Sequence, residues 1–399
     1  MGAQRTAYWA ENLHKYGYYP IVITRQWNES QTTLTEKVVN NEMVVEKCDG
    51  YEVHRLPYKE SLRDRLDQKG EFKFLQKALT LKEIVLSNFS IAALPYSNFY
   101  AYAKSLLQSD SEIGIVIASG RPFQSFAIGH QLKKDFPKIH WVPDYRDEWS
   151  TTQQGNLSFL QRMDVTLEHK VLSNATIGIT VSRYIAEKLK EKFRLDFSVV
   201  MNGIAKFDER QNGISSNFSD ELHVLYAGTL YAEQNVEILI QACKAYSGKV
   251  KLKFVGIEIN SAEKNRVIAF SDKHKVDVVI ESRKSPEMIQ VDYKNADLLF
   301  ITGFSNIKGY LPVKMFSNFQ TGKAILLCPS DNNVMEEFIQ KTNSGYIANT
   351  VEECKQILQE LLEKKKRGES IALERNMEVA YFYSREYQTK KLAEILDSL

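Results

Sequence analysis

Cysteine is scarce in this sequence, and long apolar runs are missing. The four cysteines (Cys48, Cys243, Cys328 and Cys354) lie far apart among 399 residues and form no C-x-x-C pair. This pattern argues against a disulfide scaffold and against a zinc ribbon, and it makes a reducing cytoplasm the expected location. No apolar run approaches the roughly 20 residues that a membrane-spanning helix needs.

An excess of charge of one sign is missing as well. The chain carries 52 Lys and Arg residues against 50 Asp and Glu residues, so its formal net charge is +2. Proteins that bind nucleic acids usually present a broad basic field. We therefore expect no nucleic-acid partner. At roughly 150 residues per domain, the length predicts two or three domains.

Several motifs that identify enzyme classes are also absent. The sequence contains no G-x-G-x-x-G, no P-loop, no G-x-S-x-G, no H-E-x-x-H and no D-x-D. Their absence argues against nicotinamide-dependent Rossmann enzymes, P-loop NTPases, α/β-hydrolases and zinc proteases. It also leaves no candidate for the metal clamp of the sugar transferases that use D-x-D. We predict neither a cofactor nor a metal site.

The sequence does contain a long alternation of strands and helices. Buried apolar runs predict strands in the first half at 20–24, 113–118, 139–143, 176–181 and 197–201. A second series predicts strands at 222–227, 251–255, 276–280, 297–302 and 324–328. Helical patterns between them imply right-handed crossovers and parallel sheets. We predict an α/β protein with two Rossmann-like, doubly wound domains facing a cleft.

A change in composition marks the boundary between these domains. Residues 205–220 are rich in Asn, Ser, Gly and charged residues and lack apolar periodicity, so we interpret them as a linker. The N-terminal domain would then span 1–204 and the C-terminal domain 221–384. The last helix, at about 385–399, is a candidate to pack back onto the first domain.

Ligands of such sheets bind beyond the carboxyl ends of the strands. The segment 309–326 is the most informative of those that follow a strand. Its loop with Gly309 and Pro312 opens a short helix, and Lys314 lies in the first turn. Free N–H groups at a helix start and a lysine ammonium would suit a diphosphate. An ordinary helix capped by Pro and Gly explains the pattern equally well.

Motifs in both halves resemble those of GT-B-fold glycosyltransferases of family four. In the second half they are Tyr-Ala-Gly-Thr-Leu-Tyr, Phe-Val-Gly, Arg-Lys-Ser-Pro-Glu and Gly-x-x-Pro-x-Lys-x-Phe, in that order. In the first half they are Gly-Ala-Gln-Arg before a helix, Ser-Gly-Arg-Pro, Asp-Tyr-Arg-Asp-x-Trp, Val-Ser-Arg and Val-Val-Met-Asn-Gly-Ile. The resemblance covers nearly the whole chain.

The resemblance implies a hexosyltransferase-type enzyme. The family transfers a sugar from a nucleotide-diphosphate donor, usually with retention at the anomeric carbon and without a metal. The acceptor would be a surface polysaccharide or a glycolipid, reached from the cytoplasmic side. Peripheral contact with the inner membrane face would suit a lipid-linked acceptor.

The resemblance also implies site residues in both domains. Asp147, next to Arg146, matches the catalytic-side pair beside the reacting sugar; a helix cap or a partner for Arg146 is the structural alternative. Lys314 matches the main phosphate contact; a solvated helix lysine is the alternative. The other donor-side positions are Gly2, Arg5, Gly228, Thr229, Gly256, Arg283, Lys284, Ser285, Gly309, Pro312 and Ser317.

The sequence departs from the family at four positions. Thr229 and Asn235 stand where many relatives carry Arg and Lys, and the family's paired glutamates fall at Gly309 and Ser317. A serine can hydrogen-bond but supplies no charged acceptor. Two alternatives therefore stay open: a catalytically weak paralogue that serves as a binding or scaffold partner, and a nucleotide-sugar epimerase of the same architecture.

Two basic stretches have both a structural and a functional interpretation. Residues 59–107 combine basic and aromatic side chains, which fits either a membrane surface or ordinary amphipathic helices. The residues concerned are Lys73, Phe74, Lys77, Lys82, Phe89, Tyr96, Phe99, Tyr100 and Tyr102. Lys188, Lys190, Lys192 and Arg194 are predicted to form a solvated helix face.

The start of the chain conflicts with the predicted fold. A doubly wound domain begins with a buried strand followed by its phosphate loop, but here the matching loop already occupies residues 2–5. We expect either an N-terminally shortened chain or a first sheet without its central strand.

Overall fold

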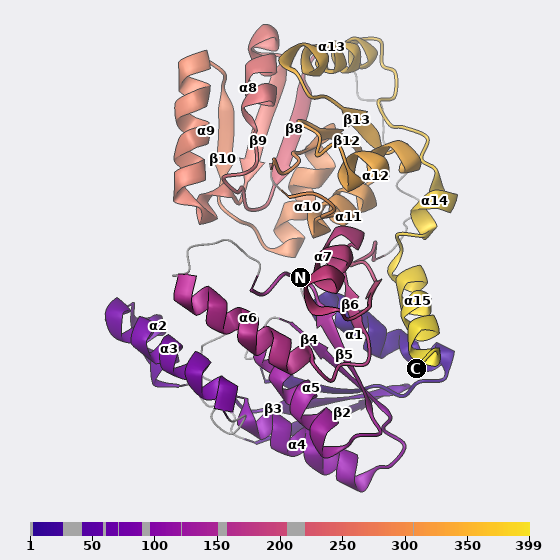
Figure 1. Cartoon of the computed structure of the whole chain (residues 1–399). Helices are drawn as coiled ribbons and strands as arrows, with labels where there is room; N and C mark the ends of the chain where they lie inside the picture. The colour runs from indigo at the N-terminus through magenta and orange to yellow at the C-terminus, as the bar shows by residue number, and fades with distance from the viewer. Residues whose placement is uncertain are drawn as a thin grey trace. The chain divides into compact units, whose positions relative to one another are not determined.

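The computed structural model describes residues 3–26, 42–58, 61–70, 72–89, 96–120, 122–150, 158–205, 220–305 and 307–399. Contacts divide the chain into two compact units (Figure 1). The first unit comprises residues 1–201 and 389–399, and the second comprises residues 202–388. Most of the predicted linker lies outside the described residues.

The strands of the first unit form two separate sheets. The first has the order β1-β3-β2, with β1 parallel and β2 antiparallel to β3. The second is all-parallel, with the order β4-β5-β6-β7. The strands are β1 (Ile21–Arg25), β2 (Val44–Cys48), β3 (Tyr51–Leu56), β4 (Ile115–Ser119), β5 (His140–Tyr145), β6 (Gly178–Thr180) and β7 (Phe197–Val199).

Within the described part of this unit, no strand joins the two sheets. The edge strands β1 and β4 each pair with one neighbour, and helix α1 (Ala3–Asn12) comes before β1. Strand β2 was not predicted, because Val44 and Val45 are both exposed and give no buried-strand pattern.

Helices cover both faces of the four-stranded sheet. Side chains alternate along β5, so that Trp141 and Tyr145 face one side and Val142 faces the other. Helices α5, α6 and α7 pack on the first side, and α1 and α15 pack on the second. The helices are α2 (Leu62–Lys69), α3 (Lys73–Phe89), α4 (Ser97–Ser109), α5 (Gln124–Asp135), α6 (Ser158–Leu172), α7 (Arg183–Phe193) and α15 (Arg385–Asp397), with the 3-10 turn η1 (Leu13–Tyr16) after α1.

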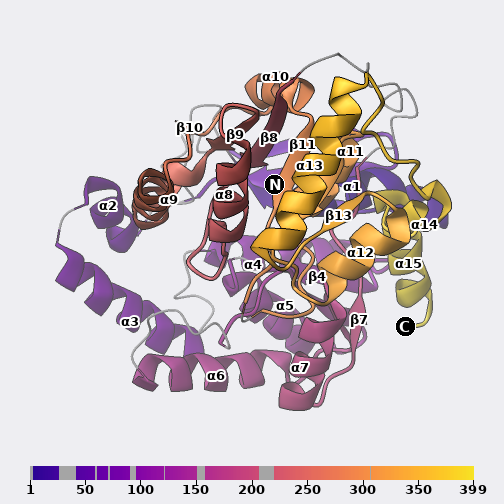
Figure 2. The same ribbon diagram turned by 90° about the horizontal axis from the view of Figure 1, so that it is seen from above.

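The second unit contains one parallel sheet of six strands in the order β10-β9-β8-β11-β12-β13. Its strands are β8 (Leu222–Ala227), β9 (Val250–Val255), β10 (Val278–Glu281), β11 (Leu298–Ile301), β12 (Ala324–Leu327) and β13 (Gly345–Ile347). Its helices are α8 (Glu237–Cys243), α9 (Ser261–His274), α10 (Pro286–Asn295), α11 (Val313–Gln320), α12 (Val334–Thr342), α13 (Val351–Lys366) and α14 (Met377–Tyr381), with the short turns η4 (Lys244–Tyr246) and η5 (Ile257–Ile259). Figure 2 shows α8 and α13 side by side.

Three of the four cysteines lie in the core around the six-stranded sheet of the second unit. Cys243, Cys328 and Cys354 belong to one buried cluster, whereas Cys48 of the first unit is half-buried. Burial raises the pKa of the Cys243 thiol. Hydrogen bonding to Cys354, together with burial, raises the pKa of Cys328. These thiols act as apolar packing groups.

The predicted doubly wound α/β architecture is confirmed, with different element ends. The prediction that β5 ends at residue 143 is wrong, because Asp144 and Tyr145 continue the strand. The strand can include a buried carboxylate there, because Arg5 and Ser119 hydrogen-bond to it. No described helix is long and apolar enough to cross a membrane.

The contact between α5 and β5 leads to a testable prediction. A Cβ atom added at Gly129 would lie 1.8 Å from Nε1 of the buried Trp141. Because a packed core cannot yield that much space, Gly129→Ala should lower the stability of the fold by about 1–3 kcal/mol. Thermal unfolding followed by circular dichroism should show a melting temperature several degrees lower.

Gly114→Ala is the matched control, because no atom lies within 4 Å of a Cβ at that position. Its effect should stay within about 0.5 kcal/mol. Equal melting temperatures for the two variants would contradict the packing described for α5.

Candidate functional site

Lys314 lies at the carboxyl end of the six-stranded sheet of the second unit, in the first turn of α11. Its Nζ donates hydrogen bonds to Oη of Tyr226 (2.7 Å) and to the carbonyl oxygen of Thr229 (3.1 Å). The ammonium also lies 4.4 Å from the centre of the Tyr226 ring. Burial lowers the pKa of Lys314 to about 7. The side chain is therefore held inward and is not a solvated helix lysine.

The two glycines predicted near the donor lie beside this lysine. Gly228 has a φ of 120°, and a Cβ there would approach Lys314 Nζ to 3.4 Å. Gly256 has a φ of 89°, and its Cβ would meet the Gly228 backbone at 3.6 Å. Both loops come directly after strands, β8 and β9. Their bare backbones allow a ligand to approach close to the lysine.

Neutral groups occupy the positions where the family carries cations. Gln234 is buried, and its amide bridges the Tyr231 N–H and the carbonyl of Thr302. Asn235 accepts a hydrogen bond from the N–H of Glu237 at the start of α8. Thr229 contributes its carbonyl to Lys314. Two cations from other elements contact this loop: Arg266 of α9 donates to the carbonyl of Gln234 (2.6 Å), and Lys314 donates to that of Thr229.

The loop after β10 contains Arg283, Lys284 and Ser285. Arg283 is exposed, while its backbone N–H donates to Oε1 of Glu258 at 2.6 Å. The second oxygen, Glu258 Oε2, is buried without a partner among the described residues. Lys284 pairs with Glu281 and Asp292. Sequence reasoning missed Glu258, which has no motif around it.

Ser285 and the loop before α11 have clear local roles. Ser285 Oγ accepts the N–H of Met288 and caps α10. Gly309 has a φ of 69°, and its N–H donates to Oδ1 of Asn333 at 3.0 Å. Pro312 is the N-cap residue of α11. Ser317 is half-buried, one turn after Lys314. Whether these residues bind a donor stays a prediction.

In the first unit, Arg5 and Asp144 form a buried ion pair of 2.7 Å. Arg5 Nη2 also donates to the carbonyl of Val200 at 2.6 Å, and its guanidinium lies 4.2 Å from the centre of the Trp9 ring. Burial lowers the pKa of Arg5, against the opposing effect of Asp144. Arg5 is therefore enclosed by protein groups, and Gly2 lies outside the described residues.

The segment after β5 carries the predicted pair Arg146 and Asp147. Both are half-buried, and Arg146 Nε donates to the carbonyl of Gly120 in the turn after β4. The N–H of Gly120 in turn donates to the carbonyl of Asp144 (3.0 Å). The ends of β4 and β5 are thus tied together, which places Asp147 at the carboxyl edge of the sheet.

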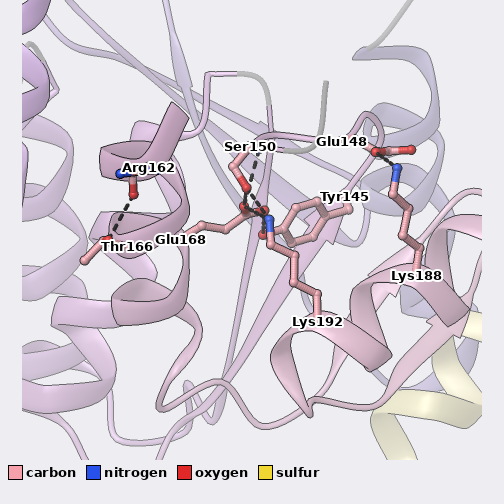
Figure 3. A network of polar contacts seen from close by, with 8 residues as sticks. All are labelled: Tyr145, Glu148, Ser150, Arg162, Thr166, Glu168, Lys188 and Lys192. Carbon is pink, nitrogen blue, oxygen red and sulfur yellow. Dashed lines mark hydrogen bonds and ion pairs between the residues drawn. The ribbon is translucent and has the colours of Figure 1, made fainter. Parts of the chain in front are cut away.

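A buried glutamate anchors the other end of this segment (Figure 3). Glu168 of α6 accepts hydrogen bonds from Tyr145 Oη (2.9 Å), from the backbone N–H of Ser150 (3.3 Å) and from Ser150 Oγ. Lys192 Nζ lies 3.6 Å from the same carboxylate. Burial raises the pKa of Glu168 despite these partners. The network fixes residues 146–150 between two anchored ends.

Lys192 therefore corrects the prediction of a solvated basic face on α7. Its ammonium also donates to Ser150 Oγ at 2.5 Å, and its side chain is only 22% exposed. Lys188 pairs with Glu148 at 2.6 Å. Alternation of Lys with core positions cannot distinguish a solvated lysine from one that reaches a buried acid on another helix. Lys190 does face solvent.

Comparisons with known proteins address the fold. No family model and no curated protein matches the sequence. Among solved structures, sucrose-phosphate synthase from Thermosynechococcus elongatus superposes with a TM-score of 0.60 at 14% identity, covering 98% of this chain and 92% of that one. Trehalose 6-phosphate synthase from Burkholderia multivorans gives 0.57 at 8% identity, with 95% and 96% covered. The chain has the GT-B fold.

A third GT-B-fold structure was solved with ligands. Anabaena HepE, in complex with UDP and glucose, superposes with a TM-score of 0.52 at 13% identity, covering 76% of this chain and 82% of that one. Among the described residues of the present chain, no group of three or more His, Cys, Asp or Glu side chains could hold a metal ion.

The Glu168 network leads to a second prediction. Glu168→Ala would leave Lys192 without its acid and Tyr145 Oη without its acceptor. Because the site is buried, the free energy of unfolding should fall by about 3–5 kcal/mol. Thermal unfolding should show this as a lower melting temperature.

Glu187→Ala is the control on the neighbouring helix α7. Glu187 forms an ion pair with Arg183, and the two side chains are 64% and 86% exposed, respectively. Exposed pairs of this kind contribute about 0–1 kcal/mol to stability. If Glu168→Ala were as mild as Glu187→Ala, the network would not anchor the segment.

Proposed function

We propose that this GT-B-fold protein is a glycosyltransferase that uses a nucleotide-diphosphate sugar. The observation that carries the proposal is Lys314, a half-buried lysine at the carboxyl edge of a parallel sheet. Its partners are a phenol and a carbonyl, so its charge is not neutralised by an acid among the described residues. An anionic ligand is the group that would stabilise the ammonium there.

The chemistry requires a group of this kind. As the glycosidic bond to the diphosphate breaks, negative charge grows on the leaving group and the sugar becomes oxocarbenium-like. A preorganised ammonium, with N–H groups at the start of α11, would stabilise the leaving diphosphate. The open backbones of Gly228 and Gly256 would let the phosphates come close.

We assign the acceptor side to the first unit. Asp147 would orient the acceptor hydroxyl or the donor sugar, and Arg146 would hold its segment through Gly120. The proposal includes transfer of a hexose with retention and without a metal ion, to a surface polysaccharide or glycolipid on the cytoplasmic side. The complex of HepE with UDP and glucose supports this choice of donor class.

A specific observation supports the alternative of a catalytically weak paralogue. The loop after β8 carries Thr229 and Asn235 in place of family cations, and both are engaged in fixing the loop. Ser317 cannot supply a carboxylate. Such a protein would still bind the nucleotide sugar but would turn it over slowly. The epimerase alternative predicts isomerised donor without any acceptor.

Binding of donors tests the proposal directly. A panel of uridine and guanosine diphosphate sugars should include one that raises the melting temperature of the full chain. Lys314→Met should reduce that shift, whereas Lys341→Met, at an exposed lysine paired with Glu337, should keep it in full. Absence of binding at millimolar donor would exclude both enzyme hypotheses.

The pH dependence of binding provides a further prediction. With a pKa of about 7, Lys314 is an ammonium below pH 7 and becomes neutral as the pH rises. The diphosphate of a nucleotide sugar stays ionised throughout this range. Donor affinity, measured by calorimetry, should therefore fall about tenfold from pH 6 to pH 8. In Lys314→Met the weaker binding should not depend on pH; a flat wild-type profile would argue against contact with this lysine.

Asp147→Asn separates binding from chemistry. Donor affinity should stay unchanged, while transfer should fall by about 10²-fold or more if this carboxylate acts on the reacting groups. Product analysis by mass spectrometry, with and without acceptor, distinguishes transfer from epimerisation and from slow hydrolysis. Unchanged transfer would remove Asp147 from the site.

A further inference from the structure

An exposed apolar tip lies at the turn between α2 and α3. Phe74 is 89% exposed, Phe72 67% and Leu75 45%, which is unusual for such large side chains. Three other aromatic residues of this stretch have internal partners: Phe99 is buried, Tyr100 hydrogen-bonds to Asp135, and Tyr102 hydrogen-bonds to His54. The mixed basic and aromatic pattern in the sequence therefore splits into a packed part and an exposed part.

The exposed residues of α3 form an ordered stripe. Phe74, Ala78 and Leu81 follow one another at helical spacing, and all three are exposed. At 100° per residue, Lys77 lies on one side of this stripe and Lys82 on the other. Both lysines are exposed, as are Lys69 and Lys73 near the turn. An apolar stripe flanked by lysines is typical of helices that lie in a membrane interface.

The base of the hairpin is fixed. Asp64 of α2 is buried and accepts hydrogen bonds from Tyr58 Oη (2.6 Å) and from the backbone N–H of Ser61. Arg63 of α2 pairs with Glu83 of α3 at 3.3 Å. Burial opposes ionisation of Asp64, but its hydrogen bonds lower its pKa. Polar contacts thus hold α2 to the segment before it and to α3, and the exposed apolar stripe takes no part in them. Figure 1 shows α3 running beside α6.

The backbone of the tip has an unusual conformation at one residue. Phe72 has a φ of 54°, a left-handed conformation that bulky residues rarely adopt. Its carbonyl accepts the N–H of Gln76 in the first turn of α3 (3.0 Å). The chain therefore holds an aromatic residue in an unfavourable conformation at an exposed turn, where glycine would be easier to accommodate.

We propose that the tip formed by Phe72, Phe74 and Leu75, with its flanking lysines, docks onto an anionic lipid bilayer. The aromatic and leucine side chains would enter the interface between headgroups and acyl chains. Lys69, Lys73, Lys77 and Lys82 would contact the anionic headgroups. This attachment goes beyond the proposed transfer reaction, because it does not depend on a donor or on Lys314.

Sedimentation with vesicles tests the docking. The full chain, at about 0.1 M salt and without nucleotide, should bind vesicles containing about one-third phosphatidylglycerol and should bind phosphatidylcholine vesicles at least tenfold more weakly. Raising the salt to about 0.5 M should weaken the binding. Failure to bind the anionic vesicles, or equal binding to both kinds, would overturn the proposal.

Variants separate the apolar and the basic contributions. Phe74→Ser with Leu75→Ser should reduce vesicle binding at least tenfold, and so should Lys73→Glu with Lys77→Glu. Matched controls in the second unit are Met288→Ser with Val291→Ser, two side chains that are each 60% exposed, and Lys273→Glu with Lys366→Glu. The controls should bind as the wild type does. Equal losses in test and control variants would overturn the assignment to this tip.

A tryptophan reporter checks insertion even if a double variant folds poorly. In Phe74→Trp, the added fluorescence should shift to the blue with anionic vesicles and stay unchanged with neutral ones. If the shift instead follows protein concentration without vesicles, the tip contacts a second copy of the chain, and the lipid proposal is wrong.

Discussion

The first unit depends on the burial of one carboxylate, Asp144. This residue is the last but one of β5 and lies on the face opposite Trp141 and Tyr145, and it receives hydrogen bonds from Arg5 of α1 and Ser119 of β4. Arg5 also binds the carbonyl of Val200, just after β7. One charged pair thus joins the N-terminal helix to three strand ends. Removing either partner would leave a buried charge uncompensated, which costs far more than the pair contributes.

Each unit holds a cation near its strand ends, but the two cations, buried Arg5 and half-buried Lys314, have different partners. Arg5 is neutralised by Asp144 and enclosed, so its charge stabilises the fold. Lys314 has only a phenol and a carbonyl, and burial lowers its pKa to about 7. A lysine in this state is poised between its two protonation forms. The same geometry therefore serves structure in the first unit and leaves a place for an anion in the second.

The sequence predicts the architecture well, because the architecture is determined by the periodicity of apolar residues and by their burial. Strand β8 has its predicted bounds, 222–227, and helix α11 begins directly after Pro312, in the segment where a helix was predicted. Strand β2 was missed because its side chains are exposed. The continuation of β5 through Asp144 could not be predicted, because its partner Arg5 is 139 residues away.

The candidate site is predicted less completely, because its side chains also have partners that are distant in the sequence. The positions of Lys314, Gly228 and Gly256 followed from motifs, but the inward direction of the lysine on α11 depends on Tyr226, which belongs to strand β8. Glu258 and Glu168 have no local signal, since their partners come from distant segments. Local patterns indicate which residues follow strands; they do not show which of those residues touch.

The distribution of thiols makes the two units distinguishable in a single labelling experiment. Cys243, Cys328 and Cys354 are buried, so a maleimide cannot reach them while the six-stranded sheet of the second unit is intact. Cys48, the half-buried thiol of the first unit, is the one open to labelling in the native protein. The number of labelled thiols against denaturant would therefore report the opening of the six-stranded sheet alone, without any introduced cysteine.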